Sequence, residues 1–205
     1  FGSVVLARQL EFGMIKPFGI PAGVSPGEDV PLPERFFGGG NLTNRGFGEN
    51  EAGPRDIGTP AGLGGIATQP TGFPLGGNAV LFHNTELRFP LIGDNVGGVI
   101  FHDMGNVYSD LGSISFRFHQ RNQQDFNYMV HAVGIGLRYR TPVGPVRADL
   151  GYALNPPRFV GFKGDINQLL TCNPALPANQ LSAVCTGVPQ RLSHFQFFFS
   201  IGQTF

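Results

Sequence analysis

Three residues of this chain have the chemistry to form a site together. Residues 36–56 are rich in glycine and contain a single Asn-Arg-Gly-Phe stretch at residues 44–47, whose cation is Arg45. Glu86 and Asp103 follow at polar positions of alternating apolar and polar stretches. An unpaired charge is costly to bury, and arginine pairs with carboxylates through two hydrogen bonds. We therefore expect Arg45 to pair with both carboxylates; an arginine solvated on a surface loop is the alternative.

Other chemistries find little support. The glycines around Arg45 suggest a phosphate loop, but no Gly-Lys-Ser/Thr ending and no helical pattern follow. The five histidines show no metal-ligand spacing, and no Gly-x-Ser-x-Gly nucleophile motif occurs. Basic and acidic residues are balanced at 14 each, so no basic footprint for nucleic acid is visible. We predict no enzyme, no catalytic residue, no metal, no cofactor and no nucleic-acid partner.

The elements that must position these residues show the two-residue period of β-strands. One face of each stretch is apolar, and the other carries polar side chains and glycines, including Glu86 and Asp103. Gly134, Gly136 and Gly151 fall on this polar face, where they would leave room for a loop or allow strand bends. The predicted strands are residues 78–91, 96–108, 131–140, 146–154 and 194–205, with a further stretch near residues 4–12 in which Arg8 interrupts the apolar face.

The connections between these stretches differ greatly in length. Turns around residues 93–95 and 142–145 are short, whereas residues 16–77, 109–128 and 155–193 form long connections. Outer-membrane barrels combine short periplasmic turns with long extracellular loops, whereas a soluble sandwich would have loops of more even length. Only 14% of the residues are charged, and no apolar run is long enough for a transmembrane helix. We therefore predict an all-β fold, a transmembrane antiparallel β-barrel.

The two cysteines, Cys172 and Cys185, lie in the same long connection. In an extracellular context such a pair is expected to form a disulfide that closes the loop, with two free thiols as the alternative.

Four motifs follow one another over most of the chain. The first is Asn44, Arg45, Gly46 and Phe47; the second spans residues 76–90 and contains Glu86; the third, residues 101–107, reads Phe-x-Asp-x-Gly-x-Val; the fourth is the hairpin of residues 134–147. In this order they resemble the C-terminal part of the barrel of the BamA/TamA superfamily, the bacterial surface antigen family. Asn44 departs from the aliphatic residue of the family's loop motif, but the arginine is in place.

The resemblance implies about the last six strands of a sixteen-stranded barrel, with the loop of residues 16–77 folded into the lumen. It also implies that Arg45 pairs there with Glu86 and Asp103. The family's periplasmic POTRA repeats and first strands are absent from residues 1–205. Six strands alone would leave two unpaired edges in lipid, where each unsatisfied backbone group costs several kcal/mol. We therefore expect this chain to be part of a longer protein.

The last predicted strand alternates aromatic residues and ends in Phe205. It resembles the family's C-terminal sorting signal, which also forms one side of a lateral gate, and a glycine in that strand would weaken its pairing. Ordinary lipid-facing aromatics are the simpler interpretation, and both hold together. The residues concerned are Phe197, Phe199, Ile201, Gly202 and Phe205.

For function, the resemblance implies an assembly factor that folds and inserts β-barrel proteins into the bacterial outer membrane. Its partners would be outer-membrane lipid, unfolded outer-membrane clients and periplasmic or lipoprotein accessory subunits. A polypeptide transporter of the two-partner secretion or TamA type is the alternative, followed by a passive porin.

Overall fold

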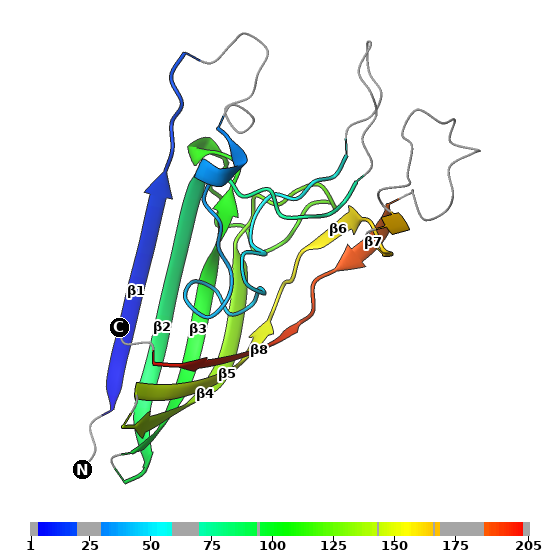
Figure 1. Ribbon diagram of the computed structural model, residues 1–205. Helices are drawn as coiled ribbons and strands as arrows, with labels where there is room; N and C mark the ends of the chain where they lie inside the picture. The colour runs from blue at the N-terminus through cyan, green and yellow to red at the C-terminus, as the bar shows by residue number, and fades with distance from the viewer. Residues whose placement is uncertain are drawn as a thin grey trace, which may run out of the picture.

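The computed structural model describes residues 4–19, 30–58, 70–93, 95–142, 144–165, 167–168 and 187–202. Its main feature is one six-stranded antiparallel sheet in the order β1-β2-β3-β4-β5-β8 (Figure 1). The predicted all-β antiparallel class is confirmed, whereas β1 and β8 do not pair with each other within the described residues, so closure into a barrel is not seen. The strands of this sheet are β1 (Val5–Met14), β2 (Ala79–Ile92), β3 (Val96–Tyr108), β4 (Val130–Thr141), β5 (Gly144–Ala153) and β8 (Phe195–Ile201).

The two faces of the sheet differ as the alternation predicts. On the outer face, Leu87, Ile100, Ile135, Leu150 and Phe197 are paired from strand to strand into one apolar row. All five are exposed, between 40% and 68%. The opposite face carries the buried side chains of β2 and β3. An exposed apolar face of this extent is typical of a surface that contacts lipid.

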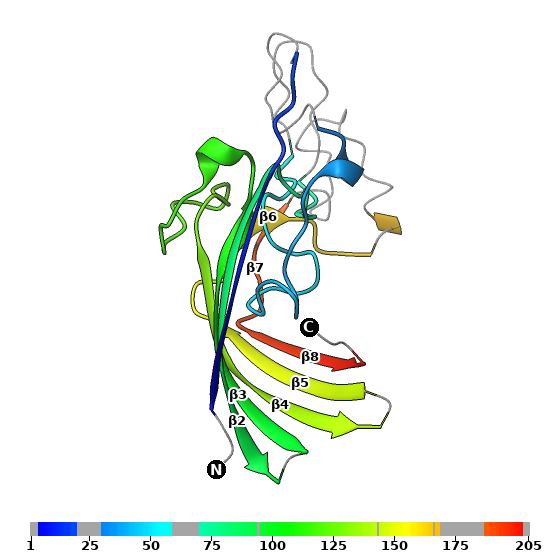
Figure 2. The same cartoon turned by 90° about the vertical axis from the view of Figure 1, so that its left-hand side faces the viewer.

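Described parts of the long connection between β1 and β2, including the segment around Arg45, lie against the inner face of the sheet. Figure 2 shows this blue segment on the side toward which β4, β5 and β8 curve. A short 3-10 helix, η1 (Leu32–Glu34), and two isolated bridges, Phe36 to Gly77 and Arg55 to Pro74, organise its described parts. In the described part of the chain, no helix is both long and apolar enough to cross a membrane.

Regular structure also occurs where the sequence predicted only loops. Within residues 155–193, β6 (Arg158–Gly161) pairs with β7 (Val188–Arg191) in a two-stranded ribbon. The connection after β3 contains the 3-10 helix η2 (Leu111–Ser113), which Asp110 caps by accepting a hydrogen bond from the backbone N–H of Ser113. This connection lies on the other side of the sheet from the blue loop (Figure 2).

Candidate functional site

The segment that carries Arg45 is a compact turn held by its own backbone. The N–H of Gly40 donates to the carbonyl of Phe47, and the N–H of Phe47 donates to the carbonyl of Asn44. Gly39 and Gly40 adopt φ of 104° and 91°, a region that side chains other than glycine rarely enter. The glycine-rich composition therefore serves a backbone shape that brings Arg45 to the sheet.

Arg45 lies among three carboxylates of three strands. Its Nε and Nη2 donate to the two oxygens of Asp103 at 2.7 and 2.8 Å, and its backbone N–H donates to the same carboxylate at 3.0 Å. Its Nη1 donates to Glu86 at 2.7 Å and lies 3.6 Å from Asp149. The guanidinium carbon is 3.4 Å from the ring centroid of Phe101, which forms a cation–π contact.

The surroundings keep this guanidinium charged although it is only 3% exposed. Burial by itself would lower the pKa of Arg45. The hydrogen bonds and charge of Asp103, followed by the charges of Glu86 and Asp149, outweigh it and raise the pKa above arginine's ordinary value. Asp103 is fully buried, so removal of Arg45 would leave a carboxylate without solvent or a cationic partner.

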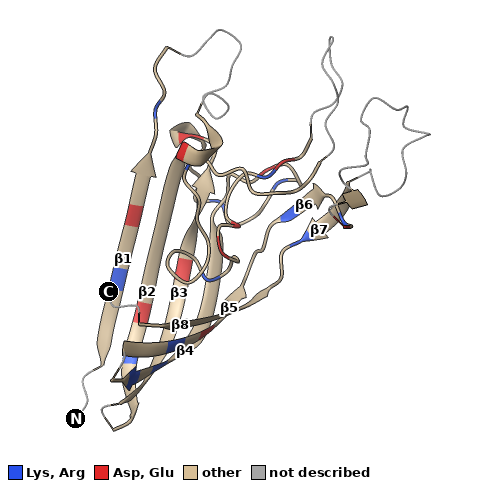
Figure 3. Ribbon diagram, in the orientation of Figure 1, with Lys and Arg blue, Asp and Glu red and all other residues tan. Residues whose placement is uncertain are grey.

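The network continues toward the short turns. Glu86 also accepts from Arg88, with the closest approach 2.7 Å, and Asp149 accepts from Arg138 at 2.6 Å. Arg138 reaches back to within 3.7 Å of Glu86, so the two pairs are joined. Figure 3 shows acidic positions on β2 and β3 beside the loop. One cation from the loop thus completes a set of charges that the strands hold in place.

The loop lies so close to the sheet that glycines are required at the contact. A Cβ on Gly151 would lie 2.3 Å from the carbonyl oxygen of Arg45. A Cβ on Gly46 would lie 2.9 Å from the Cβ of Ala132 and 3.4 Å from that of Ala153. The space on β5 is thus filled by the loop backbone. Gly134 and Gly136 leave space for strand side chains and not for the loop, because a Cβ at these positions would meet Phe101 and Asp149, respectively.

Asn44, the departure from the family motif, has a structural role of its own. Its side-chain amide donates to the carbonyls of Gly105 and Val130 at 3.2 and 3.0 Å, and its side-chain oxygen accepts from the N–H of Gly46. Asn44 is fully buried. It therefore joins the loop to β3 and β4 at the point where these strands separate.

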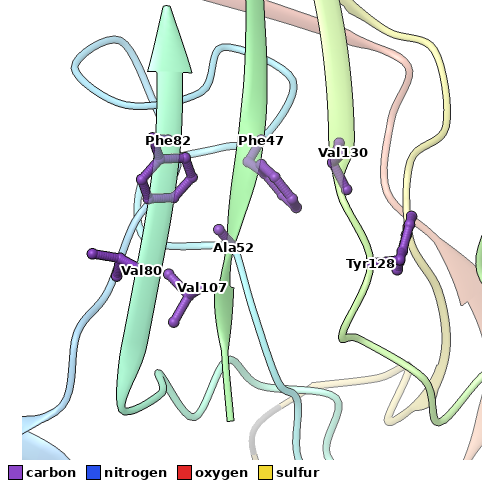
Figure 4. Close-up of a cluster of buried hydrophobic side chains, with 7 residues drawn as sticks. All are labelled: Phe47, Ala52, Val80, Phe82, Val107, Tyr128 and Val130. Atoms are coloured by element: carbon purple, nitrogen blue, oxygen red, sulfur yellow. The ribbon is translucent and has the colours of Figure 1, made fainter. Parts of the chain in front are cut away.

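Phe47 anchors the other side of the turn in an apolar cluster. Its ring is fully buried, and Figure 4 shows it directed at the strand residues of the cluster. The cluster consists of Phe47, Ala52, Val80, Phe82, Val107, Tyr128 and Val130. Burial of an aromatic side chain of this size contributes about 1.5–3 kcal/mol.

The sequence pattern does not indicate every residue of the site. Asp149 and Asn44 contact the loop or its arginine, although the pattern does not predict them as partners.

Arg55 is a second buried cation of the loop. Arg55 donates to the carbonyls of Gly72 and Glu51 and lies 4.5 Å from the ring centroid of Phe159. Burial lowers the pKa of Arg55, although the charge of Glu51 opposes the shift.

The C-terminal residues form a different part of the molecule. Phe197, Phe199 and Ile201 are exposed on the outer face of β8, at 68%, 59% and 57%. The expectation that Gly202 lies within the strand is wrong by one residue: β8 ends at Ile201, and Gly202 has a φ of 77°, although its N–H still donates to the carbonyl of Pro145 on β5. Phe205, Cys172 and Cys185 lie outside the described residues.

The arrangement can hold a loop against the sheet. The guanidinium of Arg45 pairs with the strand carboxylates, and the side-chain amide of Asn44 bonds to backbone groups. Among the described residues, no group of three His, Cys, Asp or Glu side chains could hold a metal ion.

The chain is similar to known proteins in sequence and in fold. The Omp85 superfamily domain matches residues 1–205. The chain is 28% identical over 134 residues to the outer membrane protein assembly factor BamA of Nitratidesulfovibrio vulgaris, which covers 63% of this chain and 14% of that protein. The crystal structure of BamA from Haemophilus ducreyi lacking POTRA domains 1–3 has a similar fold, with a TM-score of 0.54 and 20% identity, over 95% of this chain and 30% of that one. The chain therefore spans only a small part of both relatives.

Proposed function

Because this chain belongs to the Omp85 superfamily of outer-membrane β-barrel proteins, we propose that it forms the C-terminal wall of a barrel that folds and inserts other β-barrel proteins. The observation that carries the proposal is the Arg45 network, which holds a long loop against the inner face of a sheet whose outer face is apolar. The similarity to an outer membrane protein assembly factor supports the insertase branch.

In this proposal the loop of residues 16–77 occupies the lumen and stiffens one side of the barrel. Arg45 contacts Glu86 on β2, Asp103 on β3 and Asp149 on β5, so it spans several strands at once. Because this wall would be stiff, the barrel would open at a seam between other strands. An incoming strand could pair there with an exposed strand edge. β8 is the edge strand of the described sheet, and its aromatic outer row makes it the proposed side of that seam.

This mechanism needs neither a cofactor nor a covalent intermediate. The backbone N–H and C=O groups of a client strand would form hydrogen bonds with the exposed edge strand. The apolar face of the client strand would then contact the surrounding lipid. The proposed partners are outer-membrane lipid, unfolded outer-membrane clients and periplasmic or lipoprotein accessory subunits. We propose in the same way that the full-length protein contains further domains, including POTRA repeats.

Depletion of the full-length protein from its host tests the proposal. Complementation with the wild-type gene should restore the levels of many outer-membrane proteins, whereas Arg45→Ala should not. Loss of one partner from a buried ion pair costs about 3–5 kcal/mol. Since the three residues act as a unit, we expect Arg45→Ala, Glu86→Ala and Asp103→Ala to be non-additive in double variants. Arg121→Ala is the matched control, because Arg121 is exposed on a loop.

The readout separates the branches of function. Quantitative proteomics of the outer membrane should show a broad loss of barrel proteins on depletion. Loss of a single exported protein with normal barrel levels would instead identify a polypeptide transporter. Unchanged protein levels together with lost solute uptake would identify a porin. Additive effects of the three alanine substitutions would contradict the role of the network as a unit.

A further inference from the structure

The outer face of the sheet carries a band of basic side chains at one height. Arg8 of β1 lies 3.1 Å from His83 of β2, and His102 of β3 lies 3.1 Å from His131 of β4. The imidazole rings of His102 and His131 are stacked, with centroids 5.3 Å apart. We call Arg8, His83, His102 and His131 the basic band.

Aromatic groups extend this band at its β4 side. Phe118, from the connection before β4, packs against His131 and against His119, with ring centroids 5.3 and 5.2 Å apart. Further along, Tyr152 of β5 stacks on His194 with centroids 5.2 Å apart. Of the five histidines of the sequence, three belong to the basic band, His119 meets it through Phe118, and His194 lies on Tyr152 of the neighbouring strand.

No strand carboxylate of the described residues accompanies the band on the outer face. The acidic residues of the described strands, Glu11, Glu86, Asp103 and Asp149, occupy alternate positions that face the inner side. The band thus has a positive charge from Arg8, and its imidazoles offer N–H donors beside that charge. A cluster of basic groups with no strand carboxylate on its own face fits an anionic partner.

An apolar hollow begins directly below the band. A hollow of about 520 Å³ is lined at its upper end by Thr85 and His102 and continues to Ile100 and Ile135. These two isoleucines also line a second hollow of about 450 Å³, which extends over Gly98 and other apolar positions toward the short turns. Together the hollows form a track along the outer face, which passes over Gly98 and is bordered there by the side chains of Phe89 and Leu91.

The height of the band agrees with a membrane boundary. On β2, β3 and β4, rows of apolar residues lie between it and the short turns, and the long connections lie beyond it, whereas on the edge strand β1 the exposed Phe12 and Met14 extend past Arg8. A cationic side chain on the lipid face costs about 2–4 kcal/mol at the midplane but only about 0–1 kcal/mol near an interface. With the long loops outside the cell, the basic band lies at the outer interface.

We propose that this surface is a binding site for a phosphate-bearing lipid, whose phosphate contacts the basic band and whose acyl chain lies in the apolar track. Arg8 supplies a permanent cation, while His83, His102 and His131 supply N–H donors. The inference rests on the membrane-spanning orientation of the proposed function, but not on the insertase activity.

Binding of dioleoyl phosphatidic acid to the full-length protein in detergent tests the site. Native mass spectrometry counts bound lipid during a titration, and dioleoylglycerol, which lacks the phosphate, is the matched probe. Charge-assisted hydrogen bonds to phosphate are worth enough that His102→Gln with His131→Gln should weaken binding about tenfold. Gly98→Leu should weaken it as well, because a Cβ at Gly98 would lie 2.7 Å from the Phe89 ring and would push the Phe89 and Leu91 side chains into the track. Arg121→Gln should leave binding unchanged.

Several results would overturn the lipid site. Equal binding of dioleoylglycerol would remove the role of the phosphate, and full competition by equimolar inorganic phosphate would show an anion site without an acyl track. Unchanged binding in either variant, with folding verified by heat-modifiable gel migration, would remove the proposed contacts. Insertion of a client barrel is measured on the same preparations. Selective lipid binding without insertion would overturn the insertase alone, and insertion without selective lipid binding would overturn the lipid site alone.

Discussion

Asn44 shows how a single residue adapts a loop motif to its surroundings. An aliphatic residue at this position could fill the space, but it could not donate to the carbonyls of Gly105 and Val130. We expect Asn44→Val to destabilise the protein by about 1–3 kcal/mol, the cost of unsatisfied buried polar groups. Urea unfolding of the full-length protein measures the change.

Asn41→Val is the control for this substitution. Asn41 lies in the same loop, and its side chain makes no hydrogen bond in the part of the chain that the structure describes. A loss of stability that is equal in both variants would show that the Asn44 amide contributes nothing specific.

The contacts of Arg45 could be anticipated from residue types, but those of Asp149 could not. The motif order and strand parity placed Glu86 and Asp103 on the face that receives the loop. Asp149 lies on β5, and its approach to 3.6 Å of Arg45 depends on the curvature of the sheet. The local pattern of apolar and polar residues in the sequence gives no information about the curvature of the sheet. Asn44 was understood only as a departure from a motif, because its partners are backbone carbonyls that no side-chain pattern reveals.

At the scale of elements, the loop rests on β5 through backbone rather than side chains. Gly151→Ala would place a methyl group 2.3 Å from the carbonyl oxygen of Arg45, so the loop would have to move away. We expect this substitution to lengthen the contacts of Arg45 with Asp103 and to expose the loop to protease. The measurement is the rate of limited proteolysis of the full-length protein in detergent.

Gly97→Ala provides a matched comparison on the same face of the sheet. A Cβ at Gly97 meets nothing closer than 3.5 Å, which is an ordinary contact. Its proteolysis rate should equal that of wild type. If both alanine variants are cleaved equally fast, a general weakening of the strands, not displacement of the loop, is the cause.

Long elements could be predicted from the sequence, and short ones could not. The strands from β2 to β5 have at least ten residues each, so their alternation is evident. The ribbon of β6 and β7 has four residues in each strand, too few for a two-residue period to stand out. The end of β8 at Ile201 is set by the φ of Gly202, which the aromatic alternation does not indicate.

At the scale of the whole molecule, the outer apolar face is expected to meet lipid at a graded depth. Ile135 and Tyr139 lie on this face of β4, with Tyr139 near the short turns, and they are 61% and 51% exposed. We expect Ile135→Arg to cost about 2–4 kcal/mol and Tyr139→Arg only about 0–1 kcal/mol. Reversible urea unfolding in phospholipid vesicles provides the comparison. Equal costs at both positions would argue against a membrane-spanning band.

The charge network also has a consequence for how the sheet forms. In the β2–β3 pair, Asn84 is opposite Asp103 and Glu86 is opposite Phe101. A slip of one residue would turn the side chains of one strand to the other face. Asp103 or Glu86 would then point toward lipid, and Arg45 would enter the interior without its partner. We therefore expect docking of the loop to favour the observed register over a one-residue slip, because Arg45 meets its carboxylates only when these strands turn them to the interior.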